Sequence, residues 1–379
     1  MTMFFLMMLL FLLVISYAVF LIWLTSTLKS KNSRQALNSR RPFISVIVAA
    51  RNEDKNIREC LSHLLNQNYP AEKYEVIVID DRSEDTTVEI IKSVNNRRLK
   101  FIQITDVIST IAPKKRAIDS GIRSASGEII VTTDADCFPG QDWLTTLVGY
   151  FDEAVGLVAG YNPYKIKAGN LFQEMMALDY FAMAAVAAAF ANIGYPISCT
   201  GGNLAYRNSV FDEISGFTKF STQVSGDDDL FLEQVREKTN WKIIYANNPE
   251  SFVYTLPPAN LREFIQQRIR YASKGRLYKR NVTVVLLFVY LLNLMFCAGF
   301  FISIFSPQSF IYSATAFTVK SASEFIFLKR SSVLFHYRLS IFKFILTALI
   351  HPLYISLIGF AGQVIGFEWK GKKYGSRAA

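Results

Sequence analysis

Apolar residues form long uninterrupted runs at both ends of the chain, whereas the middle alternates short apolar runs with polar, helix-like stretches. Residues 3–24 are long enough to cross a bilayer, for which about 20 apolar residues suffice. No basic segment precedes this run and no small-residue cleavage site follows it, so we expect a retained anchor rather than a signal peptide. Near the other end, residues 282–304, 310–328 and 341–365 predict two or three more spans, with the last interrupted at Pro352.

The middle of the chain predicts an α/β fold. Short runs rich in β-branched residues are expected to form buried strands, and they lie at 43–50, 74–79, 99–104 and 128–132. The stretches between them read as helices, with Asn52 capping the first and Ser83 or Asp85 the second. Strands that alternate with helices over short links favour a mostly parallel, Rossmann-like sheet with right-handed crossovers.

Polar clusters follow three of these strands, at the edge of the sheet where ligands bind in such folds. They are Asn52-Glu53, Asp80-Asp81 and Asp134-Ala135-Asp136. Two carboxylates two residues apart form a hard-oxygen site suited to Mg²⁺ or Mn²⁺. Taken alone, the last cluster reads as a solvated acidic turn, but three clusters at one edge favour a binding site.

The predicted organisation has five parts: an N-terminal transmembrane anchor (1–28), a basic linker (29–41), a central α/β domain (42–280), a C-terminal membrane region (281–366) and a basic tail (367–379). The net charge is +10, and the cations flank apolar segments instead of interleaving with aromatic residues. This distribution favours a membrane partner over nucleic acid and places the central α/β domain in the cytoplasm. Three full C-terminal spans would put the basic tail outside, so one of them is expected to be re-entrant or interfacial, with the break at His351-Pro352.

Three further features carry structural expectations. Residues 170–192 form an apolar helix that we expect to be buried or interfacial, since a span there would separate Asp134 from the acidic cluster 227–229. Lys320 and Glu324 are four residues apart and can pair across one helical turn. The four cysteines and three histidines show no zinc or disulfide spacing and are expected to be structural.

The order of the polar motifs resembles the inverting family 2 glycosyltransferases of GT-A fold, in particular the membrane-anchored bacterial members. The motifs are Asn52-Glu53, Asp80-Asp81, Lys114, Asp134-Ala135-Asp136, Gly201-Gly202-Asn203, Asp227-Asp228 and Gln267-x-x-Arg270-Tyr271. The resemblance covers residues 42–280 in detail. Asp227 stands where the family usually has Glu, and Tyr271 stands where it usually has Trp.

The resemblance implies roles for these residues. The donor, a nucleotide sugar, would be bound by Glu53, Asp80, Lys114, Asp134, Gln267 and Arg270. Asp134 and Asp136 would hold Mg²⁺ or Mn²⁺, and Gly202, Asn203 and Tyr271 would contact the acceptor. Asp228, with Asp227 beside it, would take the proton of the acceptor hydroxyl.

The expected function is transfer of a hexose from a UDP-sugar to a hydroxyl of a lipid or lipid-linked acceptor at the cytoplasmic membrane. Two alternatives stay open at this point. One is a processive polysaccharide synthase of the same family, and the other is a catalytically silent membrane scaffold.

Overall fold

The computed structural model describes residues 2–28, 41–106, 111–369 and 372–375. Most of the predicted basic linker, residues 29–40, and residues 370–371 and 376–379 of the predicted tail therefore lie outside the described residues. The chain divides into two compact units. The sheet unit comprises Ser30–Ile166 and Val186–Pro257, and the helical unit comprises Met1–Lys29, Lys167–Ala185 and Pro258–Ala379. Residues 258–280, expected in the catalytic domain, thus group with the helical unit.

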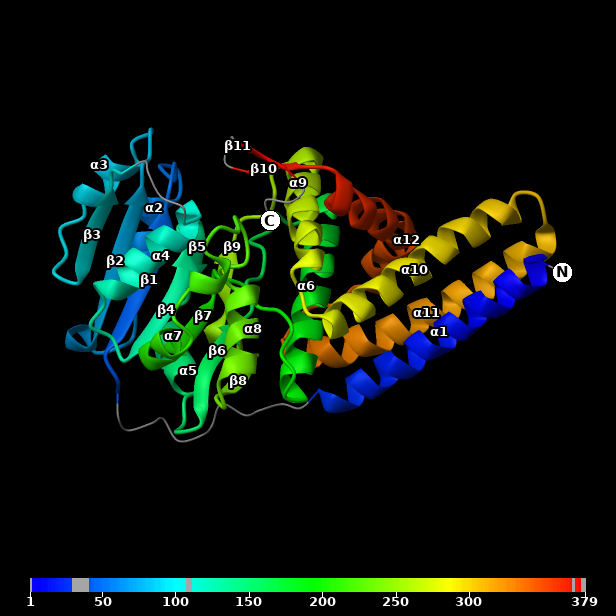
Figure 1. Cartoon of the computed structure of the whole chain (residues 1–379), viewed down its shortest axis with the longest axis horizontal. Coiled ribbons are helices and arrows are strands. Elements are labelled where there is room, and N and C mark those ends of the chain that lie inside the picture. The colour runs from blue at the N-terminus through cyan, green and yellow to red at the C-terminus, as the bar shows by residue number, and fades with distance from the viewer. Residues whose placement is uncertain (1, 29–40, 107–110, 370–371, 376–379) are drawn as a thin grey trace. The chain divides into compact units, whose positions relative to one another are not determined.

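A seven-stranded sheet forms the centre of the sheet unit (Figure 1). Its spatial order is β3 (Leu99–Ile104), β2 (Tyr74–Asp81), β1 (Ile44–Ala50), β4 (Ile129–Asp134), β7 (Leu204–Arg207), β6 (Val155–Gly160) and β8 (Lys242–Ala246). β7 runs antiparallel to both neighbours, and the other paired strands run parallel. Two short strands, β5 (Cys137–Pro139) and β9 (Val253–Thr255), pair separately. The predicted mostly parallel α/β sheet is confirmed.

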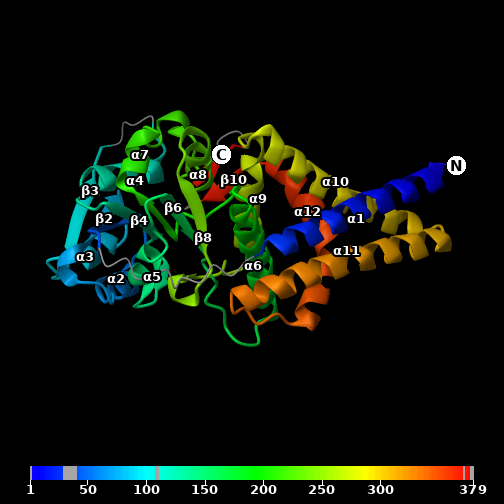
Figure 2. The same cartoon turned by 90° about the horizontal axis from the view of Figure 1, so that it is seen from below.

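Helices cover both faces of this sheet (Figure 2). One face carries α2 (Ile57–Leu65), α3 (Thr87–Lys92) and α5 (Trp143–Val148), and the other carries α4 (Pro113–Arg123), α7 (Asn208–Glu213) and α8 (Asp229–Lys238). Single 3-10 turns lie at Ala71–Lys73, Thr218–Phe220 and Pro249–Ser251. Coverage on both faces explains why the strands read as continuous apolar runs instead of alternating ones.

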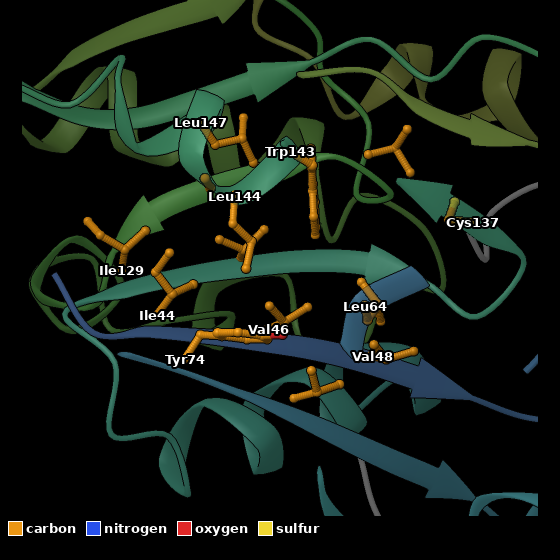
Figure 3. Close-up of a cluster of buried hydrophobic side chains, with 14 of the residues drawn as sticks. Ile44, Val46, Val48, Leu64, Tyr74, Ile129, Cys137, Trp143, Leu144 and Leu147 are labelled. Carbon is orange, nitrogen blue, oxygen red and sulfur yellow. The ribbon is translucent and has the colours of Figure 1, made fainter. Parts of the chain in front are cut away.

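The core of the sheet unit is built by alternate residues of the strands. Val46 and Val48 point to the face where Leu64 and Trp143 pack (Figure 3). Each such buried side chain contributes about 1.5–3 kcal/mol. On the opposite face α4 approaches so closely that a Cβ at Gly121 would lie 2.5 Å from Ile79 Cδ1. The rigid sheet that results fixes the strand ends that carry the polar clusters.

The predicted cap Asn52 is wrong, and of the two candidates for the second helix only Asp85 bonds to its start. α2 begins at Ile57 after Asn56, because Asn52 adopts a left-handed conformation with φ 53° and instead accepts a hydrogen bond from Glu84 N at 2.8 Å. Ser83 does not cap α3, since its hydroxyl donates to Asp80. The other candidate, Asp85, accepts a hydrogen bond from Thr87 N at 3.0 Å. Short polar side chains in such turns bond to neighbouring backbone in several ways, which sequence spacing does not distinguish.

The helical unit contains α1 (Thr2–Thr27), α9 (Leu261–Ser273), α10 (Arg280–Ser303), α11 (Pro307–Leu334) and α12 (Ile341–Val364), with a 3-10 turn at Lys274–Arg276. α6 (Leu171–Asn192) belongs to this unit as far as Ala185. Leu10, Val14, Leu292, Phe296 and Ala316 form a buried core among α1, α10 and α11. Large apolar side chains cover the outward surfaces of these helices, among them Leu12, Val19, Phe301, Leu349 and Phe360.

Among the described residues, four helices are long and apolar enough to cross a membrane: Phe5–Thr27, Leu171–Asn192, Arg280–Ser303 and Ile341–Val364. In α11, Lys320 Nζ pairs with Glu324 Oε1 at 2.7 Å, as the four-residue spacing predicts. The same carboxylate accepts a hydrogen bond from the hydroxyl of Tyr17 in α1 at 2.9 Å. Polar side chains inside this bundle therefore bond to one another.

The predicted break at His351-Pro352 is wrong, because α12 continues through Pro352. A proline removes one helix hydrogen bond, yet apolar helices of this kind tolerate it when neighbours compensate. Within the tail, β10 (Phe367–Trp369) and β11 (Lys372–Tyr374) form a hairpin, and the backbone N–H of Glu368 donates to Gln266 of α9 at 2.7 Å.

Candidate active site

The carboxyl ends of β1, β2 and β4 bring the predicted polar clusters side by side. Ala50 of β1 is in register with Asp80 of β2, and Ala49 is in register with Asp134 of β4. Asp134 is the last residue of its strand, so β4 extends two residues beyond its predicted end. The sheet itself therefore sets the spacing between Asp80, the candidate for nucleoside binding, and Asp134, the candidate for metal binding.

The loops after β1 and β2 are held together by hydrogen bonds. The backbone N–H of Glu53 donates to Thr87 Oγ1 at 2.7 Å, and its carboxylate accepts from Asn56 Nδ2 at 2.9 Å. Asp80 is fully buried and accepts bonds from both the hydroxyl and the backbone N–H of Ser83. These contacts fix the two predicted nucleotide-binding carboxylates at neighbouring strand ends.

Asp81 is a feature that the sequence analysis gave no role. Arg51, Arg82 and Arg116 surround its buried carboxylate, with the Arg82 Nε at 3.0 Å and the Arg116 Nη2 at 2.5 Å. The consecutive aspartates Asp80-Asp81 are visible in the sequence as a possible charged site. The three arginines come from separate segments, so the sequence does not show that they meet at Asp81. The cluster keeps positive charge beside the nucleoside-side loops.

Lys114, at the start of α4, joins two acidic clusters. Its Nζ lies 2.8 Å from Asp134 Oδ1 and 2.9 Å from Asp227 Oδ2. Burial lowers the pKa of Lys114, but the carboxylates of Asp134 and Asp227 more than offset this, so the pKa lies well above its usual value. Lys114 is therefore a fixed positive charge between the metal-side and base-side aspartates.

The neighbouring Lys115 has a different role. Its side chain is fully buried, and its Nζ donates to the backbone carbonyl of Ser225 at 2.7 Å and to that of Gln223. These carbonyls lie just before Gly226, which has a φ of 87° and leads into Asp227. Lys115 thereby holds the segment that delivers the acidic cluster, a role that sequence reasoning did not identify.

The acidic site after β4 has the donors that a divalent cation needs. The ligand atoms of Asp134, Asp136 and Cys137 lie within 4.8 Å of one another. Gly202 leaves room there, because a Cβ at this glycine would lie 3.1 Å from Asp134 Oδ2. Burial raises the pKa of the Cys137 thiol well above its usual value, with the Asp136 and Asp134 carboxylates adding to the effect. The residues present thus fit a cation, and Asp134 and Asp136 would hold it.

The Gly201-Gly202 loop is locked onto β4. Thr132 Oγ1 donates to the carbonyl of Gly201 and Thr133 Oγ1 donates to that of Gly202, each at 2.9 Å. On its other side, Gly201 N donates to Asp228 Oδ2 at 3.2 Å. The loop is therefore a short physical link between the cation-side strand and the predicted base.

Asp228 is the N-cap of α8, and its side chain accepts a hydrogen bond from Asp229 N at 2.7 Å. Together with the bond from Gly201, this gives each carboxylate oxygen one backbone N–H donor. Such bonds fix the direction of a carboxylate. Capping and base chemistry are thus compatible at this residue.

Asn203 requires a correction, because it was expected to contact the acceptor. Its side chain is 0% exposed, and Nδ2 donates to the carbonyls of Tyr161 and Ser251 at 3.0 and 2.8 Å. Oδ1 accepts a bond from Trp143 Nε1 at 3.0 Å. With these bonds made inside the protein, Asn203 anchors the glycine loop to the core instead of meeting a substrate.

Gln267, Arg270 and Tyr271 lie on α9 in the helical unit. The Arg270 guanidinium lies 5.3 Å from the centroid of the Tyr271 ring, and Lys274 Nζ lies 5.6 Å from it. Arg268, which sequence reasoning gave no role, is buried and pairs with Asp179 of α6 at 2.8 Å. That ion pair connects α9 to α6 and so positions the helix that carries the motif.

Comparison with known proteins identifies the segment that holds the sheet-unit site. Residues 45–215 match the sequence model of the family described as Glycosyl transferase family 2. These residues form a family 2 glycosyltransferase domain. The match covers β1 through β7 and so includes Asp80, Lys114, Asp134 and the glycine loop.

Relatives agree with this family, and a solved structure shares the fold. The chain is 36% identical over 144 residues to glycosyltransferase AglE of Haloferax volcanii, which is 36% of this chain and 45% of that protein. It is 25% identical over 63% of its length to a dolichyl N-acetyl-α-D-glucosaminyl phosphate 3-β-D-2,3-diacetamido-2,3-dideoxy-β-D-glucuronosyltransferase of Methanococcus voltae, covering 75% of that protein. The mannosyltransferase PcManGT of Pyrobaculum calidifontis, solved with GDP-Man and Mn²⁺, superposes with a TM-score of 0.56 at 19% identity over 92% of this chain and 98% of that one. This likeness shows that the fold is GT-A.

The glycosyltransferase domain and the segment that follows it place five predicted site residues in a single network. Lys114 contacts Asp134 and Asp227, and Gly202 lies against Asp134. Asp228 joins this group through Gly201. The network combines carboxylates that fit a cation, a fixed ammonium and a further carboxylate held by backbone N–H groups.

Proposed function

We propose that this protein transfers a hexose from a nucleotide sugar to a hydroxyl group of a lipid or lipid-linked acceptor at the membrane, with inversion at the anomeric carbon. The observation that carries the proposal is the contact of Lys114 with both Asp134 and Asp227, one residue from Asp228. It puts a positive charge for a departing diphosphate next to a carboxylate that can accept a proton. The donor nucleotide is expected to be UDP.

In this reaction the acceptor oxygen bonds to the anomeric carbon while the bond from that carbon to the diphosphate oxygen breaks. Asp228 accepts the proton of the acceptor hydroxyl, a task for which its two backbone hydrogen bonds orient it. Lys114 stabilises the negative charge that develops on the leaving diphosphate. A divalent cation, held by Asp134 and Asp136, would supply Lewis-acid stabilisation of the same charge.

Other residues would bind the substrates. Glu53 and Asp80, at the ends of β1 and β2, would contact the nucleoside. Family resemblance assigns Gln267 and Arg270 to the diphosphate, for which a planar guanidinium is well suited. Tyr271 and Gly202 would meet the acceptor.

The membrane location rests on the helical unit. Its outward surfaces carry large exposed apolar side chains, while the ion pair of Lys320 and Glu324 is turned inward. This arrangement is typical of helices surrounded by lipid. We propose that the chain is anchored through these helices with the catalytic domain in the cytoplasm, and that α6 is buried or interfacial.

The lipid-linked acceptor is proposed on two grounds. One relative, the Methanococcus voltae enzyme, carries in its name a dolichyl phosphate-linked acceptor. In addition, a membrane-anchored domain meets acceptors that are themselves held in the bilayer. A processive polysaccharide synthase of the same family is the competing activity.

The test is lipid extraction and mass spectrometry of cells that express the wild-type chain, Asp228→Asn or Asp119→Asn. Asp119 is a matched control because it is an aspartate on the outer surface of α4, paired with Arg123. We expect a hexose-sized mass increase on one lipid class with the wild type and the control, and none with Asp228→Asn. Loss of a surface polymer without any lipid shift would favour the synthase. Full biological activity in cells that carry Asp136→Ala, without the cation-binding carboxylate, would favour the scaffold.

A further inference from the structure

The cation site after β4 contains two side chains that the carboxylate motif does not explain. Cys137 follows Asp136 directly and is 1% exposed, and its Sγ lies 3.9 Å from Asp136 Oδ1. Asn162, just after β6, is 2% exposed, and its Nδ2 lies 3.8 Å from the same sulphur. Both side chains are therefore enclosed next to the carboxylates.

These groups converge on one small volume beside Gly202. A Cβ at this glycine would lie 2.9 Å from Asn162 Nδ2, 3.1 Å from Asp134 Oδ2 and 3.2 Å from Cys137 Sγ. Bonds from a divalent cation to oxygen and sulphur are about 2.0–2.3 Å long, so shifts of roughly 1 Å would let all three donors share an ion. Glycine at position 202 keeps that volume free of a side chain.

A polar atom without a partner points to the missing ligand. Oδ1 of Asn162 is buried and has no hydrogen-bond partner among the described residues. Leaving such an oxygen unsatisfied costs about 1–3 kcal/mol. Because the oxygen and nitrogen of an amide have nearly the same shape, turning the amide by half a turn directs Oδ1 at the volume beside Gly202. A cation there would give this oxygen its partner.

We propose that Cys137 and Asn162 complete the cation site of Asp134 and Asp136, which makes it a mixed oxygen and sulphur site. A thiolate ligand favours borderline and soft divalent ions, so the site would prefer Co²⁺ or Cd²⁺ to Mg²⁺. The proposal rests on the proposed function only in taking Asp134 and Asp136 as cation ligands. It adds a sulphur ligand and a metal preference.

The test is Co²⁺ titration of the purified full chain in detergent without any nucleotide sugar. Coordination of Cys137 gives a sulphur-to-cobalt charge-transfer absorption in the near ultraviolet. We expect this band in the wild type and in Cys60→Ser, a matched control whose buried thiol lies 3.7 Å from the backbone carbonyl of Asp134. We expect no band in Cys137→Ser, and at least tenfold weaker Cd²⁺ binding there with Mg²⁺ binding changed less than twofold.

Several outcomes overturn the proposal. The proposal is wrong if the wild type shows no charge-transfer band, and this result does not depend on whether the Cys137 variant folds. It is also wrong if the band persists in Cys137→Ser. Asn162→Leu should weaken Co²⁺ binding at least tenfold, and unchanged binding would remove Asn162 from the site. If Mn²⁺-dependent transfer occurs but no band forms, the sulphur ligand is wrong and the proposed function stands; if no Co²⁺ binds and no transfer occurs, both fail.

Discussion

Replacing Lys114 by Met should strengthen cation binding and weaken catalysis at the same time. The ammonium lies 2.8 Å from Asp134 Oδ1 and therefore opposes a divalent cation bound to that carboxylate. Removing it lowers the repulsion on the cation and frees the carboxylate. The same change removes the charge that would stabilise the leaving diphosphate, so binding and turnover are expected to move in opposite directions.

The magnitude follows from the geometry. With a cation–oxygen bond of about 2.1 Å, the cation would lie within roughly 5 Å of Lys114 Nζ. The side chains of Lys114 and Asp134 are 21% and 35% exposed, so water screens the interaction substantially. A divalent and a monovalent charge at roughly 5 Å with water-like screening repel by about 1.7 kcal/mol. This corresponds to at least a tenfold increase in Mn²⁺ affinity, whereas turnover should fall by about 10²–10³.

The assay counts free Mn²⁺ by electron paramagnetic resonance in titrations of the purified full chain in detergent. Lys114→Arg keeps the charge and should bind Mn²⁺ within about threefold of the wild type. Lys73→Met removes an exposed lysine before the amino end of β2 and should change nothing. Equal or weaker Mn²⁺ binding by Lys114→Met, with its thermal unfolding cooperative, would refute the electrostatic reasoning.

Three further predictions concern stability and positioning. Glu75→Gln should destabilise the fold by about 2 kcal/mol at pH 7, because the carboxylate pairs with Lys100. Burial raises the pKa of Glu75, but the bonds that its carboxylate makes outweigh burial and lower the pKa overall. Thermal melts should therefore show the stability difference between variant and wild type vanishing as the pH falls below 4.5. Lys320→Met should lower the free energy of unfolding by about 3 kcal/mol in detergent melts, because it leaves the buried charge of Glu324 unpaired. The double variant Lys320→Met with Glu324→Gln should recover most of this loss. Equal losses in the two variants would contradict the reasoning. Thr132→Val removes the hydrogen bond to the Gly201 carbonyl and should lower kcat at least tenfold, with KM for the donor unchanged. Thr132→Ser keeps the hydroxyl and should restore kcat. A normal kcat in the valine variant would exclude a positioning role for Thr132.

The sequence alone determined the elements and the positions of most polar motifs. Apolar runs of strand length, separated by amphipathic stretches, predicted β1 to β4, and the bounds of β3 matched the prediction. This works because each element's burial leaves a pattern in its own sequence, continuous in a strand covered on both faces and periodic in a surface helix. The carboxylates at the ends of β1, β2 and β4 were predicted for the same reason, since parallel strands end at one edge.

Only the tertiary structure decided which side chains meet. Lys114 and Asp227 are over a hundred residues apart, and the contact between them depends on how α4 packs against the segment before α8. Asn203 belongs to a recognisable motif, yet the fold buries it against Trp143. Cys137 and Asn162, the proposed further ligands, carried no spacing signal, because donors of a shared site can come from any strand that ends nearby. Sequence periodicity reports burial along one element, whereas partners across elements are fixed by packing.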